Sequence, residues 1–380
     1  MKLLIDARMY GLEHSGIGRY IINLIEGLKK LGNKEQFVVL LRKKYFDQLN
    51  LPSNWKKVLA NFRHYTFEEQ FKIPGIIKKE RPDLVHFPHI NFPILYRGMH
   101  VITVHDLTMQ RQGISATTLP LPVYYLKRLP FLLASRIGIK SAVAIITPSD
   151  TVKNDVSEYY NIDKNNIFVT YEGVDFGKFE NHLRGDPEGL LGRWNLQTAK
   201  YFLYVGNAYP HKNLGIVVKA IKKLNAEKDL NIKLAIAGSK DVFKERLQNL
   251  VRQENAEKYV KTLGYASDEE LSVLYKSSIA FVYPSLSEGF GLQGLEAIAS
   301  GSLVIASDIP VFKEIYEENV LYFNPNDVNS LVEAMKKVMK ISGEEKTQMI
   351  SRAKDFIKKY SWQEMAKETL EIYKQILEKK

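Results

Sequence analysis

Cysteine is absent from this sequence of 380 residues. Its absence excludes a disulfide framework, a metal site built from thiolates and a cysteine nucleophile. It is also typical of proteins that work in a reducing compartment such as the cytoplasm. Apolar residues make up 45% of the chain and charged residues 26%, which is ordinary for a globular protein, and the length favours two domains.

Long uncharged apolar runs are also missing. The longest apolar stretch covers residues 119–145 and is interrupted by four basic residues. A membrane-spanning helix needs about 20 nearly uncharged residues, so none is predicted. Only three apolar residues precede Asp6, and such a short run does not form an export signal. We therefore expect a cytoplasmic protein.

Acidic residues are scarce in the first part of the chain. Residues 1–150 hold 22 Lys and Arg against 11 Asp and Glu, whereas residues 151–380 hold 32 of each. The net charge of +11 therefore arises entirely in the first two fifths. Such asymmetry favours a polyanion or an anionic membrane surface as a neighbour of that half. No basic-aromatic stacking motif or recognition-helix module accompanies it, so nucleic acid is not expected as a partner.

Strand and helix patterns alternate along the chain and then start again. The first series predicts strands at residues 3–5, 37–41, 83–87, 101–104 and 142–147, with helices at 20–31, 74–79 and 122–140. The second predicts strands at 201–206, 233–237, 280–283 and 303–306, with helices at 213–224, 271–276 and 292–299. This alternation predicts an α/β protein with two parallel sheets, joined by a polar linker at 180–198. A capping box at 361–364 predicts a C-terminal helix.

Ligands of open α/β sheets bind at the carboxyl ends of the strands. The first candidate there is the turn at residues 11–19, where Gly16 and Gly18 let backbone N–H groups approach a phosphate. It lacks the third glycine of a dinucleotide fingerprint and the Lys-Ser/Thr of a P-loop, and a tight turn without a ligand is the alternative. The second is His105, which suits a hydrogen bond to a substrate hydroxyl or proton transfer, or else a structural role.

Two further strand ends carry more specific patterns. In residues 206–213, Lys212 opens a helix and suits a diphosphate, with an ordinary solvated lysine as the alternative. In residues 287–297, Glu288 and Glu296 lie eight positions apart and bracket a glycine-rich turn. Exposed N–H groups and two carboxylates together suit a ligand with phosphate and sugar parts. A surface position for Glu296 and a helix-dipole partner at Glu288 are the alternatives.

Taken in order, these segments resemble the family 4 retaining nucleotide-sugar glycosyltransferases of the GT-B fold, over almost the whole chain. The matching segments are residues 16–20, 104–107, 147–149, 173–175, 204–213, 263–271 and 288–297. The resemblance implies two Rossmann-like domains whose parallel sheets face each other across a cleft, and a C-terminal helix that crosses back to the N-terminal domain. It implies an acceptor domain at 1–180 with helix 361–380, and a donor domain at 195–360.

The resemblance also implies roles for individual residues. His105 would lie beside the sugar, Lys212 would neutralise the departing diphosphate, and Glu288 would contact the sugar, so these three are the expected catalytic residues. The expected donor-binding residues are Gly16, Gly18, Asn207, Lys212, Tyr265, Glu288, Gly289, Phe290, Gly291, Leu292 and Glu296. Many relatives carry a basic residue where Asn207 stands, so Arg19 and His211 are weaker candidates for supplying positive charge.

The expected reaction moves a hexose, with mannose favoured, from a GDP- or UDP-linked sugar to a glycan or lipid-linked acceptor in cell-surface polysaccharide or glycolipid synthesis. Retention is expected through front-face attack assisted by the leaving phosphate. The sequence contains no Asp-x-Asp motif, so no essential metal and no other cofactor is expected. A sugar-nucleotide epimerase on the same fold is the alternative.

Residues 119–140 mix Leu, Pro, Tyr and Phe with four basic residues. Such a segment suits the interface of an anionic membrane, and an interdomain helix with a solvated basic face is the alternative. Together with the excess of positive charge, it favours an anionic acceptor environment such as a lipid-linked sugar, with the protein peripheral on the inner membrane face.

Overall fold

The computed structural model describes the chain except residues 33, 112, 114–116, 118, 119, 181–186, 199, 229, 239–242 and 380. Residues 181–186 of the expected linker and residue 119 of the expected membrane-interface segment lie outside the described residues. The chain divides into two compact units. Unit 1 comprises Met1–Arg111, Leu119–Gly173 and Tyr360–Lys380, and unit 2 comprises Gln112–Thr118 and Val174–Lys359.

Unit 1 is built on a seven-stranded parallel sheet in the order β3-β2-β1-β4-β5-β6-β7, counted over the described residues. Its strands are β1 (Lys2–Asp6), β2 (Gln36–Leu41), β3 (Trp55–Leu59), β4 (Leu84–Phe87), β5 (His100–Thr103), β6 (Ala144–Thr147) and β7 (Ile167–Val169). Its helices are η1 (Leu12–His14), α1 (Ser15–Lys30), α2 (Lys43–Phe46), α3 (Phe67–Glu80), α4 (Thr108–Arg111), α5 (Leu121–Ser141), α6 (Asp150–Tyr160), η3 (Lys164–Asn166) and α16 (Trp362–Glu378).

The strands of unit 1 are apolar on both faces because helices cover both faces of a parallel sheet. In β1, Leu3 and Ile5 point into one hydrophobic cluster with α1 and α16. Leu4 points into a second cluster, which includes α3 and α6. Side chains alternate between faces along a strand, so three consecutive apolar residues contribute to two cores.

Unit 2 has a six-stranded parallel sheet in the order β10-β9-β8-β11-β12-β13 within its described part. Its strands are β8 (Tyr201–Val205), β9 (Lys233–Ala237), β10 (Val260–Gly264), β11 (Phe281–Tyr283), β12 (Val304–Ser307) and β13 (Leu321–Phe323). Its helices are α7 (Phe176–Glu180), α8 (Pro187–Gly192), η4 (Pro210–Lys212), α9 (Leu214–Lys228), α10 (Lys244–Gln253), α11 (Asp268–Ser277), α12 (Leu292–Ala299), α13 (Pro310–Tyr316), α14 (Val328–Lys340) and α15 (Gly343–Ile357).

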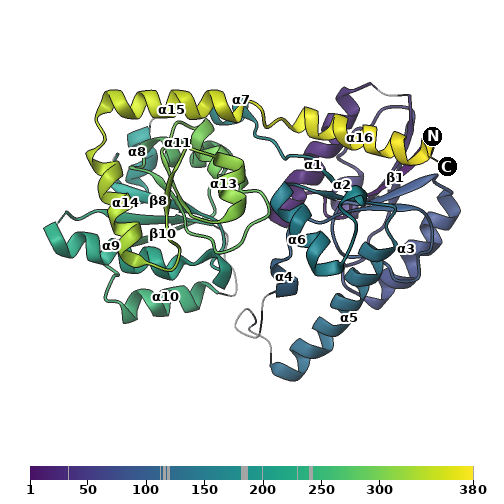
Figure 1. Cartoon of the computed structure of the whole chain (residues 1–380), viewed down its shortest axis with the longest axis horizontal. Coiled ribbons are helices and arrows are strands. Elements are labelled where there is room, and N and C mark those ends of the chain that lie inside the picture. Colours follow the sequence, from purple (N-terminus) through teal and green to yellow (C-terminus); the bar gives the residue numbers. More distant parts are fainter. Residues whose placement is uncertain are drawn as a thin grey trace. The chain divides into compact units, whose positions relative to one another are not determined.

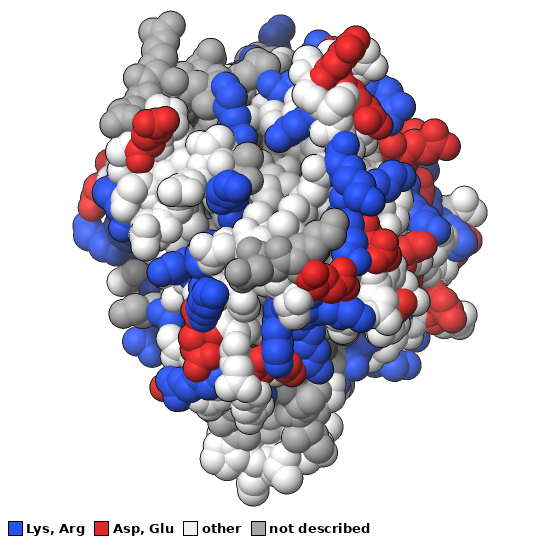
Figure 2. Space-filling model, turned by 90° about the vertical axis from the view of Figure 1, so that its left-hand side faces the viewer, with Lys and Arg blue, Asp and Glu red and all other residues white. Residues whose placement is uncertain are grey.

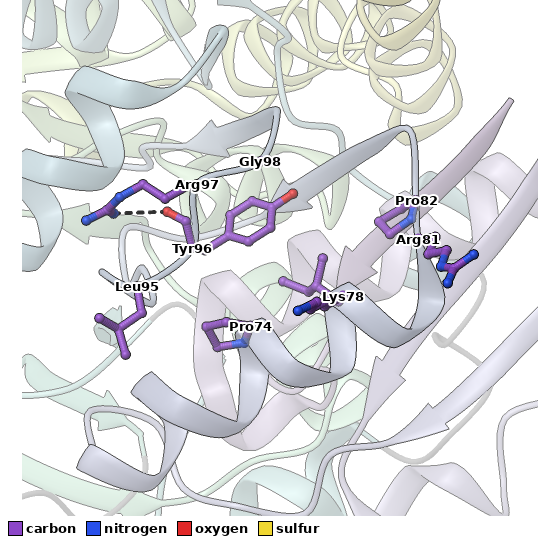
Figure 3. Close-up of a pocket in the computed structure, with 9 residues that line it drawn as sticks. Pro74, Lys78, Arg81, Pro82, Leu95, Tyr96, Arg97 and Gly98 are labelled. Carbon is purple, nitrogen blue, oxygen red and sulfur yellow. Dashed lines mark hydrogen bonds between the residues drawn. The ribbon is translucent and has the colours of Figure 1, made fainter.

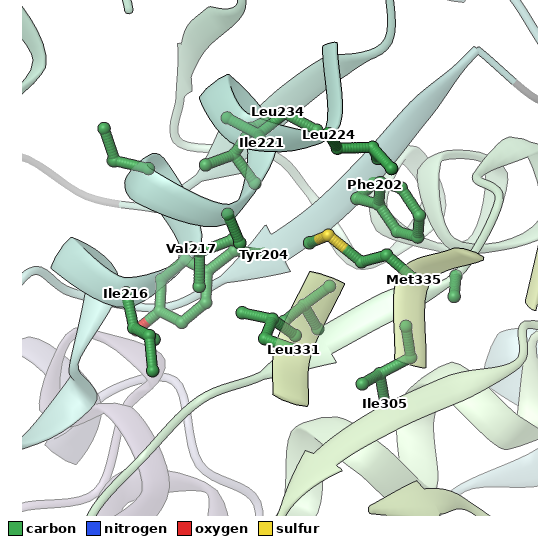
Figure 4. Packing of buried hydrophobic residues seen from close by; sticks show 14 of the residues in the cluster. Phe202, Tyr204, Ile216, Val217, Ile221, Leu224, Leu234, Ile305, Leu331 and Met335 are labelled. Atoms are coloured by element: carbon green, nitrogen blue, oxygen red, sulfur yellow. The ribbon is translucent and has the colours of Figure 1, made fainter. Parts of the chain in front are cut away.

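The core of unit 2 is closed by two helices on one face of its sheet. Phe202 of β8, Val217 of α9 and Met335 of α14 are fully buried and converge in one hydrophobic cluster (Figure 4). Burial of each such side chain contributes about 1.5–3 kcal/mol to folding. The cluster therefore holds β8 firmly, and the loop that follows β8 is one of the expected ligand-binding segments.

Helix α16 returns to unit 1 and packs along α1 (Figure 1). The hydroxyl of Ser361 accepts hydrogen bonds from the backbone N–H groups of the first turn, and Gly27 of α1 leaves room for the methyl group of Ala366. Deeper in the interface, the Tyr373 hydroxyl lies 2.5 Å from Nδ1 of His86. The C-terminal helix that crosses back to the N-terminal part, and the α/β class with two parallel sheets, are both confirmed.

Some expected boundaries were wrong. Helix α1 begins at Ser15, so Gly16 and Gly18 lie in its first turns, and the turn before it is the short helix η1. The helix expected at 74–79 extends back to Phe67, because Thr66 caps it. Strands β3, β7, β10 and β13 were not predicted; each is only partly buried. Among the described residues, no helix is both long and apolar enough to cross a membrane.

Candidate active site

Unit 2 brings Lys212 and Glu288 together at the carboxyl edge of its sheet. Lys212 ends η4 after β8, Glu288 lies in the loop after β11, and these two strands are neighbours. The Lys212 Nζ donates to Oε1 of Glu288 at 2.6 Å, and the Ser285 hydroxyl donates to the same oxygen at 2.7 Å. Both charged side chains are 13% exposed. An ion pair this sheltered is screened less by salt than a surface pair, and it fixes the position of the ammonium group.

The glycine-rich turn after Glu288 leads directly into α12. Gly291 has φ of 103°, which an L side chain rarely adopts, and its carbonyl accepts a hydrogen bond from the Tyr316 hydroxyl. Gly294, one turn later, leaves room for the same tyrosine ring. Phe290 and Leu292 are buried on either side of the turn. The turn thus presents the positive N-terminal end of α12 beside Lys212, an arrangement that favours an anion.

Glu296 lies in the middle of α12 and is only 6% exposed. A purely surface role for this carboxylate, one of the alternatives from the sequence, is therefore excluded. Its carboxylate oxygens are acceptors, for which sugar hydroxyls are suitable donors.

The remaining candidates of unit 2 surround the ends of β8 and β10. The Asn207 side-chain oxygen accepts a hydrogen bond from the backbone N–H of Tyr209, so Asn207 shapes the turn that leads to Lys212. The carbonyl of His211 accepts from the N–H of Leu286, which ties this turn to the loop of Glu288. Tyr265 follows β10 and is 73% exposed, and its ring is available for stacking.

In unit 1, His105 follows β5 and is held by two acceptors. Its Nδ1 lies 3.2 Å from Oε1 of Glu172, and its Nε2 lies 3.0 Å from the carbonyl oxygen of Pro88. An ionised Glu172 and the Pro88 carbonyl are both acceptors, so the ring can donate to both only in its protonated form. Burial alone would lower the pKa of His105, but the hydrogen bond and charge of Glu172, the Pro88 carbonyl and the charge of Asp106 raise it. The surroundings of His105 therefore favour the imidazolium form.

Helix α1 connects the glycine candidates to His105. The Tyr20 ring meets the His105 ring edge to face, with 4.7 Å between the ring centres. Gly18, two residues earlier, packs against the backbone of Gly11, while Gly16 has open space around it. Arg19 is half-buried on the same first turns. The structure thus groups Gly16, Gly18 and Arg19 on the helix that contacts His105.

Sequence reasoning missed several residues of these sites. Glu172 stands directly before the segment 173–175, and Ser285 lies in the loop before Glu288. A third missed group is the buried cluster of Asp6, Arg8 and Glu69, in which Arg8 Nη2 donates to Asp6 Oδ2 at 2.7 Å. Burial would raise the pKa of the Asp6 carboxyl, but the charge of Arg8 holds it well below its usual range. The sequence offered one signal for this cluster, because Asp6 directly follows the strand predicted at residues 3–5.

The candidates form one group on each unit, around His105 in unit 1 and around Lys212 and Glu288 in unit 2. A hollow of about 360 Å³ lies elsewhere in unit 1, between α3 and the loop at 95–98, and none of the candidates lines it (Figure 3). Over the described part of the chain, no cluster of three or more His, Asp or Glu side chains is arranged to hold a metal ion.

Two family models match the chain. The model described as Glycosyl transferases group 1 matches residues 193–356, and the model described as Glycosyltransferase Family 4 matches residues 14–178. Together they span most of the sequence, and the two parallel sheets with a returning C-terminal helix are the GT-B fold. The chain belongs to family 4 of the glycosyltransferases and is a hexosyltransferase.

Individual relatives agree with this assignment. The O-antigen chain mannosyltransferase RfbU of Salmonella typhimurium is 28% identical over 378 residues, which cover 96% of this chain and 97% of the relative. The O-antigen chain mannosyltransferase B of Escherichia coli is 24% identical over 397 residues, covering 98% and 100%. A solved glycosyltransferase from Rickettsia africae has a TM-score of 0.73 at 21% identity, covering 99% of this chain and 98% of that one. This last likeness shows the fold.

Proposed function

We propose that this enzyme transfers a mannosyl group from a nucleotide-diphosphate sugar, GDP- or UDP-linked, to a glycan or lipid-linked acceptor in cell-surface polysaccharide or glycolipid synthesis. The single observation that carries the proposal is the sheltered ion pair between Lys212 and Glu288 beside the N-terminal end of α12. Positive charge and a carboxylate placed together suit a ligand that joins a diphosphate to a sugar. Two full-length relatives named as O-antigen mannosyltransferases support mannose as the sugar.

We assign donor binding to unit 2, within the domain at 195–360. Lys212 and the amides of 289–292 hold the diphosphate, and Glu288 accepts hydrogen bonds from the sugar. Glu296 holds the ribose hydroxyls, Tyr265 stacks on the base, and Asn207 keeps the Lys212 turn in shape. Acceptor binding belongs to the domain at 1–180 with 361–380. Gly16 and Gly18 of that domain approach the donor diphosphate, and Arg19 of unit 1 and His211 of unit 2 supply further positive charge.

The proposed reaction breaks the bond between the anomeric carbon and the phosphate oxygen, and the electron pair leaves with the nucleoside diphosphate. The acceptor hydroxyl attacks from the same face, and its proton passes to an oxygen of the leaving phosphate. Lys212 stabilises the charge that develops there, which is usually the largest contribution to catalysis. His105 takes part through the positive charge of its protonated form, because both of its ring nitrogens already face Glu172 and Pro88.

The test is a pair of substitutions, Lys212→Ala and Glu288→Ala, assayed for release of nucleoside diphosphate from GDP-mannose with saccharide-diphosphate polyprenols as acceptors. Each is expected to lower kcat by about 100- to 1000-fold, the effect of removing one preorganised electrostatic group. Lys313→Ala is the matched control, because it removes an exposed ion pair of the same unit, with Asp308. Turnover like the wild type in both site variants, with folding intact by thermal melting, would contradict the proposal.

A further inference from the structure

Helix α5 is unusual because its N-terminal part is apolar and yet exposed. Leu126 is 74% exposed, and Leu129 and Leu133 follow on the same face at i+3 and i+7. The C-terminal part is anchored through buried residues such as Gly138, which packs against Phe92. Earlier in the helix, Arg128 donates hydrogen bonds to the carbonyls of Met109 and Gln110. Figure 1 shows the N-terminal end of α5 reaching away from the sheet of unit 1. Leucines at helical spacing ordinarily face a protein core or a membrane, so their exposure here calls for an explanation.

A second exposed apolar group lies next to α5. Phe67 and Phe71 stand one turn apart on α3 and are 86% and 68% exposed. Tyr65, just before α3, contacts the ring of Phe131 of α5 with 6.0 Å between the ring centres. The two helices therefore present their apolar side chains at neighbouring places. We call this the α3–α5 surface: Tyr65, Phe67, Phe71, Leu126, Leu129 and Leu133.

On α5 and the segments that flank it the charge has one sign, and on α3 the exposed Glu68 beside Phe67 is paired with Lys72. From residue 107 to residue 149 the sequence contains no Asp or Glu, and five Lys and Arg. Lys127 is exposed within the apolar part of α5. An apolar surface whose neighbours are mostly basic complements a lipid bilayer, which has an apolar interior and, where its lipids are acidic, an anionic surface.

The hollow of about 360 Å³ extends this pattern along α3. Pro74 and Lys78 line it, and they continue the face of Phe67 and Phe71 at helical spacing. Arg81 and Arg97 lie at opposite ends of the hollow, and Leu95 beside it is exposed (Figure 3). The residues that line the hollow include the cations Lys78, Arg81 and Arg97 and no carboxylate, and such a lining suits a phosphate group.

We propose that the α3–α5 surface docks unit 1 onto an anionic lipid bilayer, with the leucines and phenylalanines in the acyl boundary and Lys78, Arg97 and Lys127 at the phosphate layer. A bilayer offers apolar and anionic layers within one helix diameter, as this surface requires. A second copy of the chain would bring like charges together, which disfavours that occupant. The proposal is independent of the transfer reaction, because it concerns binding alone.

Vesicle sedimentation of the full chain tests the proposal. Binding is expected to vesicles that contain phosphatidylglycerol and to be much weaker to pure phosphatidylcholine. The double variant Leu126→Asn with Leu129→Asn is expected to lose about tenfold or more in partitioning, since it removes two leucines from the apolar layer. Lys127→Ala is expected to lose about fivefold on anionic vesicles only.

Leu59→Asn is the matched control, because Leu59 is an exposed leucine of unit 1 at the end of β3, outside the α3–α5 surface. Its binding is expected to equal that of the wild type. Absence of vesicle binding, binding indifferent to lipid charge, or full binding by the double variant would each overturn the proposal. Self-association in sedimentation velocity that the double variant abolishes would also overturn it, by assigning the surface to a second copy.

Discussion

At the scale of the residue, charge at the candidate site is set by neighbours distant in sequence. His105 and Glu172 are 67 positions apart, and the carbonyl of Pro88 comes from a third segment. The two acceptors around one ring together favour the protonated form of His105, and the sequence does not show that they meet there. His86 lies on β4, the strand that pairs with β5. Burial and the charges of His105 and His89 lower the pKa of His86 to about 3, so this second histidine stays neutral.

This difference makes the pH dependence of His105 testable. Its pKa is raised in the folded protein, so the charged form persists above the usual range and is lost as pH rises through the raised pKa. Glu172→Gln keeps the shape and removes the charge, so the pKa of His105 should fall and the alkaline limb of kcat/KM should move to lower pH.

Histidine titration by NMR, together with the pH–rate profile, would measure both effects of Glu172→Gln. Glu158→Gln in α6 is the control, because Glu158 is an exposed glutamate of the same unit. A His105 titration that Glu172→Gln leaves unchanged would show that the carboxylate does not hold the proton.

At the scale of the element, much of the architecture followed from the sequence alone. The buried strands and α12 were predicted within a residue or two, because β9 and α12 carry uninterrupted apolar patterns. The start of α1 was not predicted correctly. Its first residues include two glycines, and glycine has a low helix propensity, so these residues were expected in a loop. The helix begins at Ser15 because Gly18 can pack on the backbone of Gly11, a contact that no local pattern shows.

The two glycines of α1 therefore predict opposite effects on stability. Gly18→Ala would place a methyl group on the carbonyl of Gly11 and is expected to destabilise the protein by about 1–3 kcal/mol. Gly16→Ala meets open space within the helix and is expected to stabilise it by about 0.5–1 kcal/mol. Urea unfolding midpoints of the two variants would measure this, and a stable Gly18→Ala would contradict the close packing.

At the scale of the whole molecule, the sequence indicated two α/β domains, and the structure has two units with separate cores. The chain passes from unit 1 to unit 2 between Gly173 and Val174, within the segment 173–175 that the sequence had marked. What the sequence could not show is that Gly173 packs tightly against the backbone of Ser361 and Trp362, where α16 begins. The excess of positive charge in residues 1–150 thus belongs mainly to unit 1, and on the unit 2 side basic and acidic residues are intermixed (Figure 2).

The assignment of donor binding to unit 2 is the central claim, and hydrogen exchange tests it most directly. With GDP-mannose or a UDP-sugar at about 100 times its Kd, amides at 206–213 and 289–296 should exchange up to about 100-fold more slowly. Amides at 74–98 in unit 1 should keep their rates. Binding that protects only unit 1, or no binding of any GDP- or UDP-sugar by calorimetry, would contradict the account.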